Sequence, residues 1–226
     1  MTLTRYGWKQ WLTITSIFFT LFALSVYGVF YSSLWLISAG GCVFLWLALV
    51  SFFRNPWRII PKDLPEGMML SPADGVVSAI EFLDEHETVD GPAVCIRIFL
   101  SVLNVHINRM PCDCELDKML YRKGKFLDAR SEESAKINES NTLFLFTNGE
   151  RIGMRQVSGK IARNIVCPIH EGDRFRQGQQ FGMIKFGSTA ELILPRPEQV
   201  EIHIAKGDSV RGGLTRLATL SPQTQY

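Results

Sequence analysis

The sequence predicts a mainly β protein, a folded-over β-sandwich that is preceded by an N-terminal hairpin of two transmembrane helices. Three observations support this prediction. Residues 10–53 include no charged residue. The later part of the chain consists of short apolar runs separated by Gly, Asp, Asn and Pro, a spacing that is typical of strands. A seven-residue pattern, Gly-Asp-x-apolar-Arg-x-Gly, also occurs twice towards the C-terminus.

The uncharged stretch is long enough to cross a membrane twice, because one transmembrane helix needs about 20 apolar residues. We expect helices near residues 11–30 and 34–53, joined by a turn at 31–33. A cleaved signal peptide fits poorly, since the apolar segment is far too long and lacks a convincing small-residue cleavage site. A helical hairpin buried in a soluble core would be unusually apolar.

Basic residues flank the expected hairpin on both sides. Arg5 and Lys9 precede it, and Arg54 and Arg58 follow it. Because Lys and Arg are enriched on the cytoplasmic side of membranes, both ends of the hairpin and the whole remaining chain are expected in the cytoplasm. The expected domains are a membrane hairpin at 1–53, a linker at 54–67 and a cytoplasmic domain at 68–226.

The composition excludes several classes of function. A net charge of +2 is too small to indicate nucleic-acid binding. Five cysteines, an odd number in a chain whose main domain is cytoplasmic, argue against a disulfide framework. Cys112-Asp113-Cys114 resembles half of a metal site, but no second pair with suitable spacing accompanies it. We therefore expect no metal.

Short strands are expected to follow the linker, which contains three prolines and Gly67 and should be extended near the membrane surface. Only Ala129–Ser140 has helical character, and its charges favour a partly exposed loop with a helical turn. The expected strands are Gly75–Ile80, Ala93–Leu100, Leu143–Thr147, Met154–Val157, Ile161–Cys167, Phe181–Phe186, Leu192–Leu194 and Val200–Ile204.

The repeated pattern covers Gly172–Gly178 and Gly207–Gly213. Asp after Gly suits a tight turn, the apolar residue should point inward, and the second Gly allows the next reversal. Two such units predict pseudo-repeated hairpins in a sandwich with the layout of biotinyl- and lipoyl-carrier domains. A carrier needs a lysine at a hairpin tip, and Lys185 lacks the flanking residues that such carriers use, so carrier function is not predicted.

Three residues could form a nucleophile–base–orienter arrangement: Ser188, His106 and Asp74. Ser188 follows Gly187 between two apolar runs, so its hydroxyl lies beside an unshielded peptide carbonyl. Taken singly, each residue is more often structural, since Gly-Ser and Asp-Gly are common turn pairs. The other three histidines lack comparable surroundings and are assigned structural roles. Spacing alone does not show that the three residues meet.

Nearly the whole cytoplasmic part resembles phosphatidylserine decarboxylases of the short form. The matching motifs occur in the same order over about 170 residues, which makes an accidental match improbable. They are Phe-Arg-Asn-Pro at 53–56, Ser-Pro-Ala-Asp-Gly at 71–75, Val-His-Ile-Asn-Arg-Met-Pro at 105–111, Asn138-Glu139, the segment 159–167, Glu171-Gly172-Asp173 and Phe-Gly-Ser-Thr at 186–189.

The resemblance implies a zymogen that cuts itself between Gly187 and Ser188 into chains 1–187 and 188–226. Asp74, His106 and Ser188 would drive this cut, with Asp74 holding His106 in one tautomer. Ser188 would become a covalent pyruvoyl group, the only cofactor, which forms a Schiff base with the amine of the serine headgroup. The expected products are phosphatidylethanolamine and carbon dioxide, with His106 as the proton donor.

The resemblance also implies partners and a location. These are phosphatidylserine and membrane lipid at the cytoplasmic face of the cell membrane, and the two cleaved chains as a heterodimer. A homo-oligomer is left open, and no nucleic acid is expected. An exposed apolar rim should keep the lipid tails near the bilayer. The candidates for binding the phosphate are Arg97, Arg109, Lys123 and Arg163.

Three positions depart from the family pattern: Phe186 stands where the long branch has Leu, His170 stands where lysine is expected, and Arg109 is the third. The long branch has a second histidine three residues after the first, where this chain has Arg109. His106 must then serve both reactions, or Arg109 and water assist. Two alternatives also remain: a decarboxylase of the ether-linked lipid archaetidylserine, and an inactive membrane-tethered β-sandwich that only binds.

Overall fold

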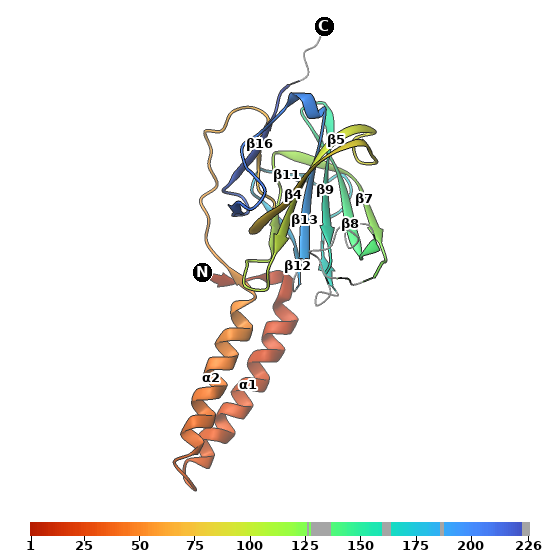
Figure 1. The fold of residues 1–226 in the computed structure, drawn as a ribbon. Coiled ribbons are helices and arrows are strands. Elements are labelled where there is room, and N and C mark those ends of the chain that lie inside the picture. The colour runs from red at the N-terminus through yellow and green to blue at the C-terminus, as the bar shows by residue number, and fades with distance from the viewer. Residues whose placement is uncertain (126, 128–136, 160–163, 186–187, 223–226) are drawn as a thin grey trace. The chain divides into compact units, whose positions relative to one another are not determined.

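The computed structural model describes residues 1–125, 127, 137–159, 164–185 and 188–222 (Figure 1). Within it the chain divides into two compact units, Met1–Trp57 and Arg58–Tyr226. The first unit is helical and the second consists of strands, which confirms the predicted fold class.

The N-terminal unit is a helical hairpin. It contains α1 (Trp8–Gly28) and α2 (Trp35–Ser51), preceded by the short 3-10 turn η1 (Arg5–Gly7). β1 (Thr2–Leu3) pairs with β2 (Arg54–Asn55) and joins the two ends of the hairpin. Both helices begin and end within three residues of the expected bounds. The agreement arises because the uncharged stretch contains no charged residue that would end either helix earlier.

The two helices contact each other through small and polar side chains. Gly28 lies directly against the Trp35 ring, and Ser25 Oγ lies 2.9 Å from Ser38 Oγ. Most of the apolar side chains point outward instead. The helical segment Arg5–Gly28 contains an 18-residue stretch with a mean hydropathy of 1.6 and has the length needed to span a membrane, whereas α2 is apolar but shorter.

The second unit is built around an eight-stranded antiparallel sheet, in the order β11-β7-β8-β9-β13-β5-β4-β15. Two three-stranded sheets, β10-β12-β6 and β14-β16-β3, accompany it. The strands of the large sheet are β4 (Gly75–His86), β5 (Gly91–Leu100), β7 (Cys114–Arg122), β8 (Ser140–Thr147), β9 (Glu150–Val157), β11 (Arg174–Phe175), β13 (Ser188–Pro195) and β15 (Ser209–Val210). Those of the small sheets are β3 (Met68–Leu70), β6 (Ile107–Arg109), β10 (Ile165–Val166), β12 (Gln180–Ile184), β14 (Val200–Ile202) and β16 (Arg216–Leu220), and the 3-10 turn η2 (Pro197–Gln199) precedes β14.

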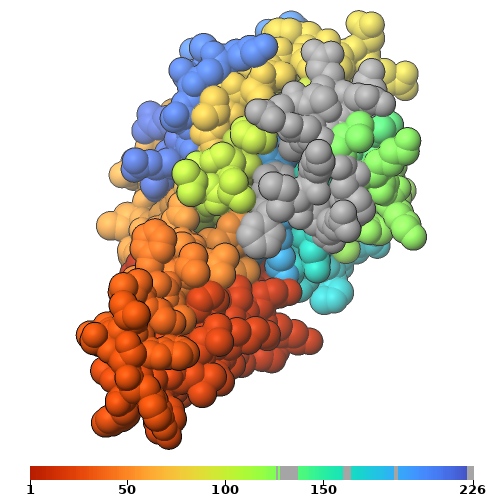
Figure 2. Space-filling view, turned by 60° about the horizontal axis from the view of Figure 1, so that its bottom comes forward, coloured from red at the N-terminus to blue at the C-terminus, as the bar shows by residue number. Residues whose placement is uncertain are grey.

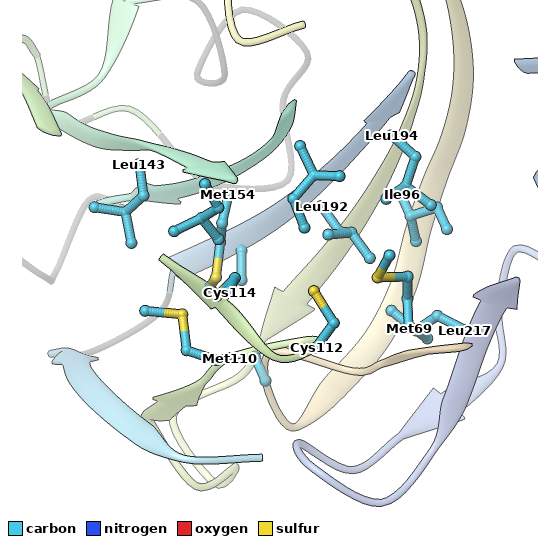
Figure 3. Close-up of a cluster of buried hydrophobic side chains, with 14 of the residues drawn as sticks. Met69, Ile96, Met110, Cys112, Cys114, Leu143, Met154, Leu192, Leu194 and Leu217 are labelled. Atoms are coloured by element: carbon cyan, nitrogen blue, oxygen red, sulfur yellow. The ribbon is translucent and has the colours of Figure 1, made fainter. Parts of the chain in front are cut away.

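The main core lies on one face of the large sheet. Ala190, Leu192 and Leu194 alternate along β13 and all belong to this core, whereas Ile193 points to the opposite face. Such alternation is what a strand imposes on successive side chains. Figure 3 shows the core side chains that face one another from the two layers: Ile96, Cys114, Leu143, Met154, Leu192 and Leu194 on the large sheet, and Met69, Met110, Cys112 and Leu217 opposite or beside them.

The repeated pattern forms two equivalent turns. Gly172, Gly178, Gly207 and Gly213 all have positive φ, which only glycine adopts without cost. In the two copies Asp173 and Asp208 each accept a 2.8 Å hydrogen bond from the amide three residues earlier. Each turn leads into a two-residue strand, β11 or β15, at opposite edges of the large sheet. The apolar residues of the two copies, Phe175 and Val210, are buried as expected.

Several strands were not predicted from the sequence. β7 carries charged residues along much of its length, so its sequence lacks an apolar run that would mark a strand. β4 extends to His86, six residues beyond the expected end. Most of the expected helical segment Ala129–Ser140 lies outside the described residues, and its last residue begins β8.

Truncation of Leu192 should destabilise the second unit. This side chain is fully buried on the central strand β13, so Leu192→Ala removes apolar contacts and leaves a cavity. We expect a loss of about 2–5 kcal/mol in the free energy of unfolding. Urea denaturation in detergent measures this, with the half-exposed Phe146→Ala on β8 as the control. An equal loss in both variants would contradict the placement of Leu192.

Candidate active site

One end of the large sheet brings two of the predicted residues together. Ser188 is the first residue of β13 and pairs with Leu100, the last residue of β5. β4 begins beside the same end of β5, at Gly75. A Cβ on Gly75 would lie 2.1 Å from the Phe99 carbonyl oxygen, so only glycine permits this close approach. Asp74, one residue earlier, therefore lies at the same end of the sheet as Ser188.

Ser188 is completely buried. Its position two residues before Ala190 places its side chain on the core face of β13. The Oγ atom has no hydrogen-bond partner within the described part of the chain. Gly187, the other residue of the expected cleavage site, lies outside the described residues. A buried hydroxyl without a partner is uncommon in folded proteins. Thr142 and Ser158 share this property among the described residues, so Ser188 is distinguished by its position at the expected cleavage site.

His106 is held by backbone groups. It is fully buried and immediately precedes β6. Its Nδ1 lies 2.9 Å from the Asn104 carbonyl oxygen. Because a carbonyl can only accept, Nδ1 must carry the proton, and a neutral ring then has its basic lone pair on Nε2. The His106 carbonyl accepts a 3.2 Å hydrogen bond from the amide of Ile184, four residues before Ser188.

Asp74 is held by an arginine that the sequence did not single out for this purpose. Arg58 donates from Nη1 to Oδ1 and from Nη2 to Oδ2, both at 2.6 Å, and both side chains are buried. The Gly212 amide donates to Oδ1 at 2.8 Å, and Arg58 Nη1 also donates to the Gly212 carbonyl. The bidentate fork matches both carboxylate oxygens, which explains why this pairing forms.

The expected hydrogen bond between Asp74 and His106 is therefore not formed. Both residues are described, and the carboxylate contacts of Asp74 go to Arg58 and Gly212. Asn104 takes the place expected for Asp74, because its carbonyl accepts from the imidazole. The two segments still meet through the backbone, since the Arg109 amide donates to the Pro72 carbonyl at 2.9 Å.

Of the four candidate phosphate ligands, two are engaged elsewhere, one is exposed and one lies outside the described residues. Arg109 is buried, and its Nη1 donates to the Gly178 carbonyl at 2.8 Å. Arg97 pairs with Glu81 and Glu191 on the face of the large sheet that is opposite the main core. Lys123 is exposed, and Arg163 lies outside the described residues. No cationic residue can be assigned to the phosphate from these contacts.

Comparison with known proteins identifies the family. The family model for phosphatidylserine decarboxylase matches residues 46–218. The chain belongs to the phosphatidylserine decarboxylase family. It is 44% identical over 171 residues to the phosphatidylserine decarboxylase proenzyme of Carboxydothermus hydrogenoformans, which covers 76% of this chain and 79% of that protein. The proenzyme of Magnetococcus marinus is 37% identical over 199 residues, 88% of this chain and 86% of that protein.

This assignment makes the protein a carboxy-lyase of phospholipid biosynthesis that is made as a zymogen. For a phosphatidylserine decarboxylase, the sheet end that carries Ser188 is the candidate active site. The described residues include no cluster of three or more His, Cys, Asp or Glu side chains that could hold a metal ion.

Sequence reasoning missed part of the surroundings of this decarboxylase site. Asn108 lies within the His106 motif but was not singled out, and it is fully buried. Gln156 Nε2 donates to its Oδ1 at 2.9 Å, and Asn141 Nδ2 donates to Gln156 Oε1 at 3.2 Å. Gln156 continues the alternation of the core residues Ile152 and Met154 along β9, and a polar residue at such a position is the signal that could have identified this network.

Proposed function

We propose that this zymogen cuts itself between Gly187 and Ser188 and then converts phosphatidylserine to phosphatidylethanolamine and carbon dioxide with a pyruvoyl group derived from Ser188. The single observation that carries the proposal is the buried Ser188 hydroxyl, which has no hydrogen-bond partner among the described residues. In a chain of this family, such an unsatisfied nucleophile at the expected cleavage site supports self-processing.

The cut uses three groups of this chain: the His106 imidazole, the Ser188 hydroxyl and the Gly187 carbonyl. His106 takes the proton of Ser188 through Nε2, the nitrogen left basic by the contact between Nδ1 and Asn104. The Ser188 oxygen attacks the carbonyl carbon of Gly187, and the peptide bond becomes an ester. Loss of the α-proton of residue 188 then breaks the ester and releases the Gly187 carboxylate. Addition of water and loss of ammonia leave a pyruvoyl group on the new N-terminus.

The residues present fit such a group. Its three carbons replace the atoms of Ser188, in a buried position on the core face of β13. When formed, a pyruvoyl group supplies a carbonyl that accepts the electron pair released when the substrate loses carbon dioxide. The chain contributes the surroundings: His106 holds a proton for delivery to carbon, and the buried site excludes water from the reacting atoms.

The two chains should stay together after the cut. β13, in residues 188–226, lies between β9 and β5, both in residues 1–187. It pairs with β5 over eight residues and with β9 over five. The short chain also contributes β14, β15 and β16. We infer a heterodimer whose chains share one sheet.

The N-terminal unit supports a location at the membrane. The segment Arg5–Gly28 meets the length and composition of a spanning helix. We infer that α1 and α2 cross the membrane as a hairpin and that the catalytic unit lies on the cytoplasmic side, because basic residues flank the hairpin. The boundary between the units falls at residue 58. Ile60 lies against Gly178 and Gly213, so this part of the proposed linker packs with the catalytic unit.

An apolar loop beside the site supports contact with lipid tails. The exposed fractions of the residues Val102 and Leu103 are 46% and 82%. They lie between Leu100, which pairs with Ser188, and His106. Figure 2 shows the surface around residue 100, in yellow-green, on the catalytic unit. This is the place where the expected apolar rim would meet the bilayer.

Replacing both Val102 and Leu103 with serine should weaken activity on vesicles. Each side chain that inserts into lipid contributes on the order of 1.5–3 kcal/mol, so we expect KM for vesicular phosphatidylserine to rise at least about tenfold. Activity on a short-chain lipid below its micelle concentration should stay the same. The control is Phe82→Ser, an exposed apolar residue on β4. Equal losses on both substrates would contradict lipid contact by this loop.

The proposed function is tested with protein purified from membranes. We expect intact mass spectrometry to show two chains, with a pyruvoyl group blocking the N-terminus of the short one. We also expect the preparation to release one carbon dioxide for each phosphatidylethanolamine formed. Fully active protein that begins its short chain with ordinary serine, or that consists of one unbroken chain, would overturn the proposal.

A further inference from the structure

Three buried amide side chains form a continuous hydrogen-bonded row that runs past β9, the strand next to β13. Asn141 on β8 donates to Gln156 on β9 at 3.2 Å, and Gln156 donates to Asn108 on β6 at 2.9 Å. Asn108 and Gln156 are completely buried, and Asn141 is 3% exposed. The row therefore connects the large sheet with the small sheet that carries β6.

The row has a direction and two unsatisfied ends. An amide oxygen only accepts and an amide nitrogen only donates, so the two hydrogen bonds orient all three groups. At one end Asn108 Nδ2 is a buried donor with no partner within the described residues. At the other end the acceptor Asn141 Oδ1 also has none. Leaving a buried donor unpaired costs about 1–3 kcal/mol, so the donor end indicates a ligand with an acceptor atom.

The middle of the row lies close to the reacting residue, and the donor end is one hydrogen bond away from it. Gln156 pairs with Ala190, which follows Ser188 by two residues and shares its face of β13. Asn108 pairs with Gly182 on β12, where an added Cβ would lie 3.2 Å from Gln156 Nε2. The absence of a side chain at Gly182 allows Gln156 to reach Asn108. Both Asn108 Nδ2 and Ser188 Oγ are thus unsatisfied polar atoms in one buried region.

We propose that Asn108 Nδ2 binds the carboxylate of the serine headgroup and holds it beside residue 188. This inference rests on the proposed function and adds a substrate contact to it. The carboxylate is the acceptor that distinguishes the substrate from its product. It must also lie close to the group at position 188, because the carbon that carries it is attached to the reacting amine.

A neutral donor suits a carboxylate that leaves as carbon dioxide. A cation in this place would stabilise the charged substrate more than the transition state, in which charge moves off the carboxylate. The nearby arginines are engaged: Arg109 by the Gly178 carbonyl, and Arg155 by Glu191 on the opposite face of β13. Burial also lowers the pKa of Lys185, which disfavours its charged form. Asn108 therefore orients the carboxylate without neutralising it.

The decisive variant is Asn108→Asp. It keeps the shape and the acceptor for Gln156 Nε2, but it replaces the donor with a second acceptor that repels a carboxylate. With rates referred to the cleaved fraction on a gel, we expect kcat/KM for phosphatidylserine to fall about 10- to 100-fold, the worth of a hydrogen bond to a charged group. In Asn108→Ala, kcat/KM for phosphatidylserine should fall by a similar factor. Unchanged kcat/KM in both variants would overturn the inference.

A second variant turns the Asn108 amide around without replacing Asn108 itself. In Gln156→Glu the carboxylate accepts from both neighbours, so the Asn108 amide turns and presents its oxygen to the site. The same loss in kcat/KM is expected. The matched control is Thr142→Val, which removes another buried hydroxyl without a described partner. Thr142 pairs with Arg155 and faces away from the core. An equal loss in Thr142→Val would show general disruption and overturn the assignment.

A binding measurement tests this inference independently of enzyme activity. In the full chain with Ser188→Ala, which cannot consume substrate, we compare glycerophosphoserine with glycerophosphoethanolamine by calorimetry. These probes differ only in the carboxylate. We expect at least about tenfold tighter binding of glycerophosphoserine, and no preference once Asn108→Asp is added. Equal binding before that addition, or a preference that survives it, overturns the inference. If the unaltered chain neither cuts itself nor decarboxylates, the proposed function itself has failed.

Discussion

Replacing Ser188 with alanine should leave the chain whole. The unaltered protein, 25.6 kDa as synthesised, should separate on a denaturing gel into chains of about 21 and 4 kDa, by residue count at a typical mass per residue. Without the Oγ atom no ester can form, so Ser188→Ala should run as a single band and show no decarboxylation. Intact mass spectrometry measures both forms.

The control for this experiment is Ser158→Ala. Ser158 is also completely buried, follows the end of β9, and has an Oγ without a partner in the described part of the chain. If loss of any buried hydroxyl at this sheet end disturbed the fold, both variants would remain uncut. We expect normal cleavage in Ser158→Ala. Cleavage in Ser188→Ala would instead show that another residue attacks the backbone.

Removing Arg58 should destabilise the catalytic unit and prevent the cut. Arg58→Ala leaves the Asp74 carboxylate buried with the Gly212 amide as its remaining described partner. Breaking a buried pair in this way typically costs about 3–5 kcal/mol. We expect a loss of that size in urea unfolding and accumulation of uncut precursor. Arg58→Lys should recover only part of the stability and part of the cleavage, because an ammonium cannot make the two parallel hydrogen bonds.

A paired replacement separates stability from chemistry. Replacing a buried ion pair with apolar residues of similar volume is often neutral for stability. The double variant Arg58→Met with Asp74→Leu should therefore regain much of the lost stability and still remain uncut. Cleavage at the normal rate in this double variant would show that the pair only supports the fold and that Asp74 takes no part in the cut.

Local patterns in the sequence predicted much of the fold. The uncharged stretch predicted both helices, because only apolar helices of that length suit a bilayer. The two Gly-Asp patterns predicted turns at four glycines with positive φ, because this conformation depends on the residue itself. β7 was missed because its stability comes from pairing with β8 and β11, and not from an apolar run of its own.

The candidate site shows where sequence reasoning ends. Motifs indicated Asp74, His106 and Ser188, but the partner of each depends on tertiary geometry. Arg58 was considered only for its charge beside the membrane, yet it binds Asp74. The orienting group for His106 is a backbone carbonyl, which no side-chain pattern can reveal. The Asn108 row likewise depends on contact between two sheets.

The central position of β13 has a consequence for the lifetime of the enzyme. Before the cut, folding is a reaction within one molecule. After the proposed cut the same native state would consist of two polypeptides, and regaining it from the unfolded state would require a second-order encounter at low concentration. Until the short chain binds, the strands β5 and β9 of the longer polypeptide would lack their partner β13 and would be prone to aggregate. Heat or denaturant should therefore inactivate mature enzyme permanently, and new synthesis becomes the route to replacement.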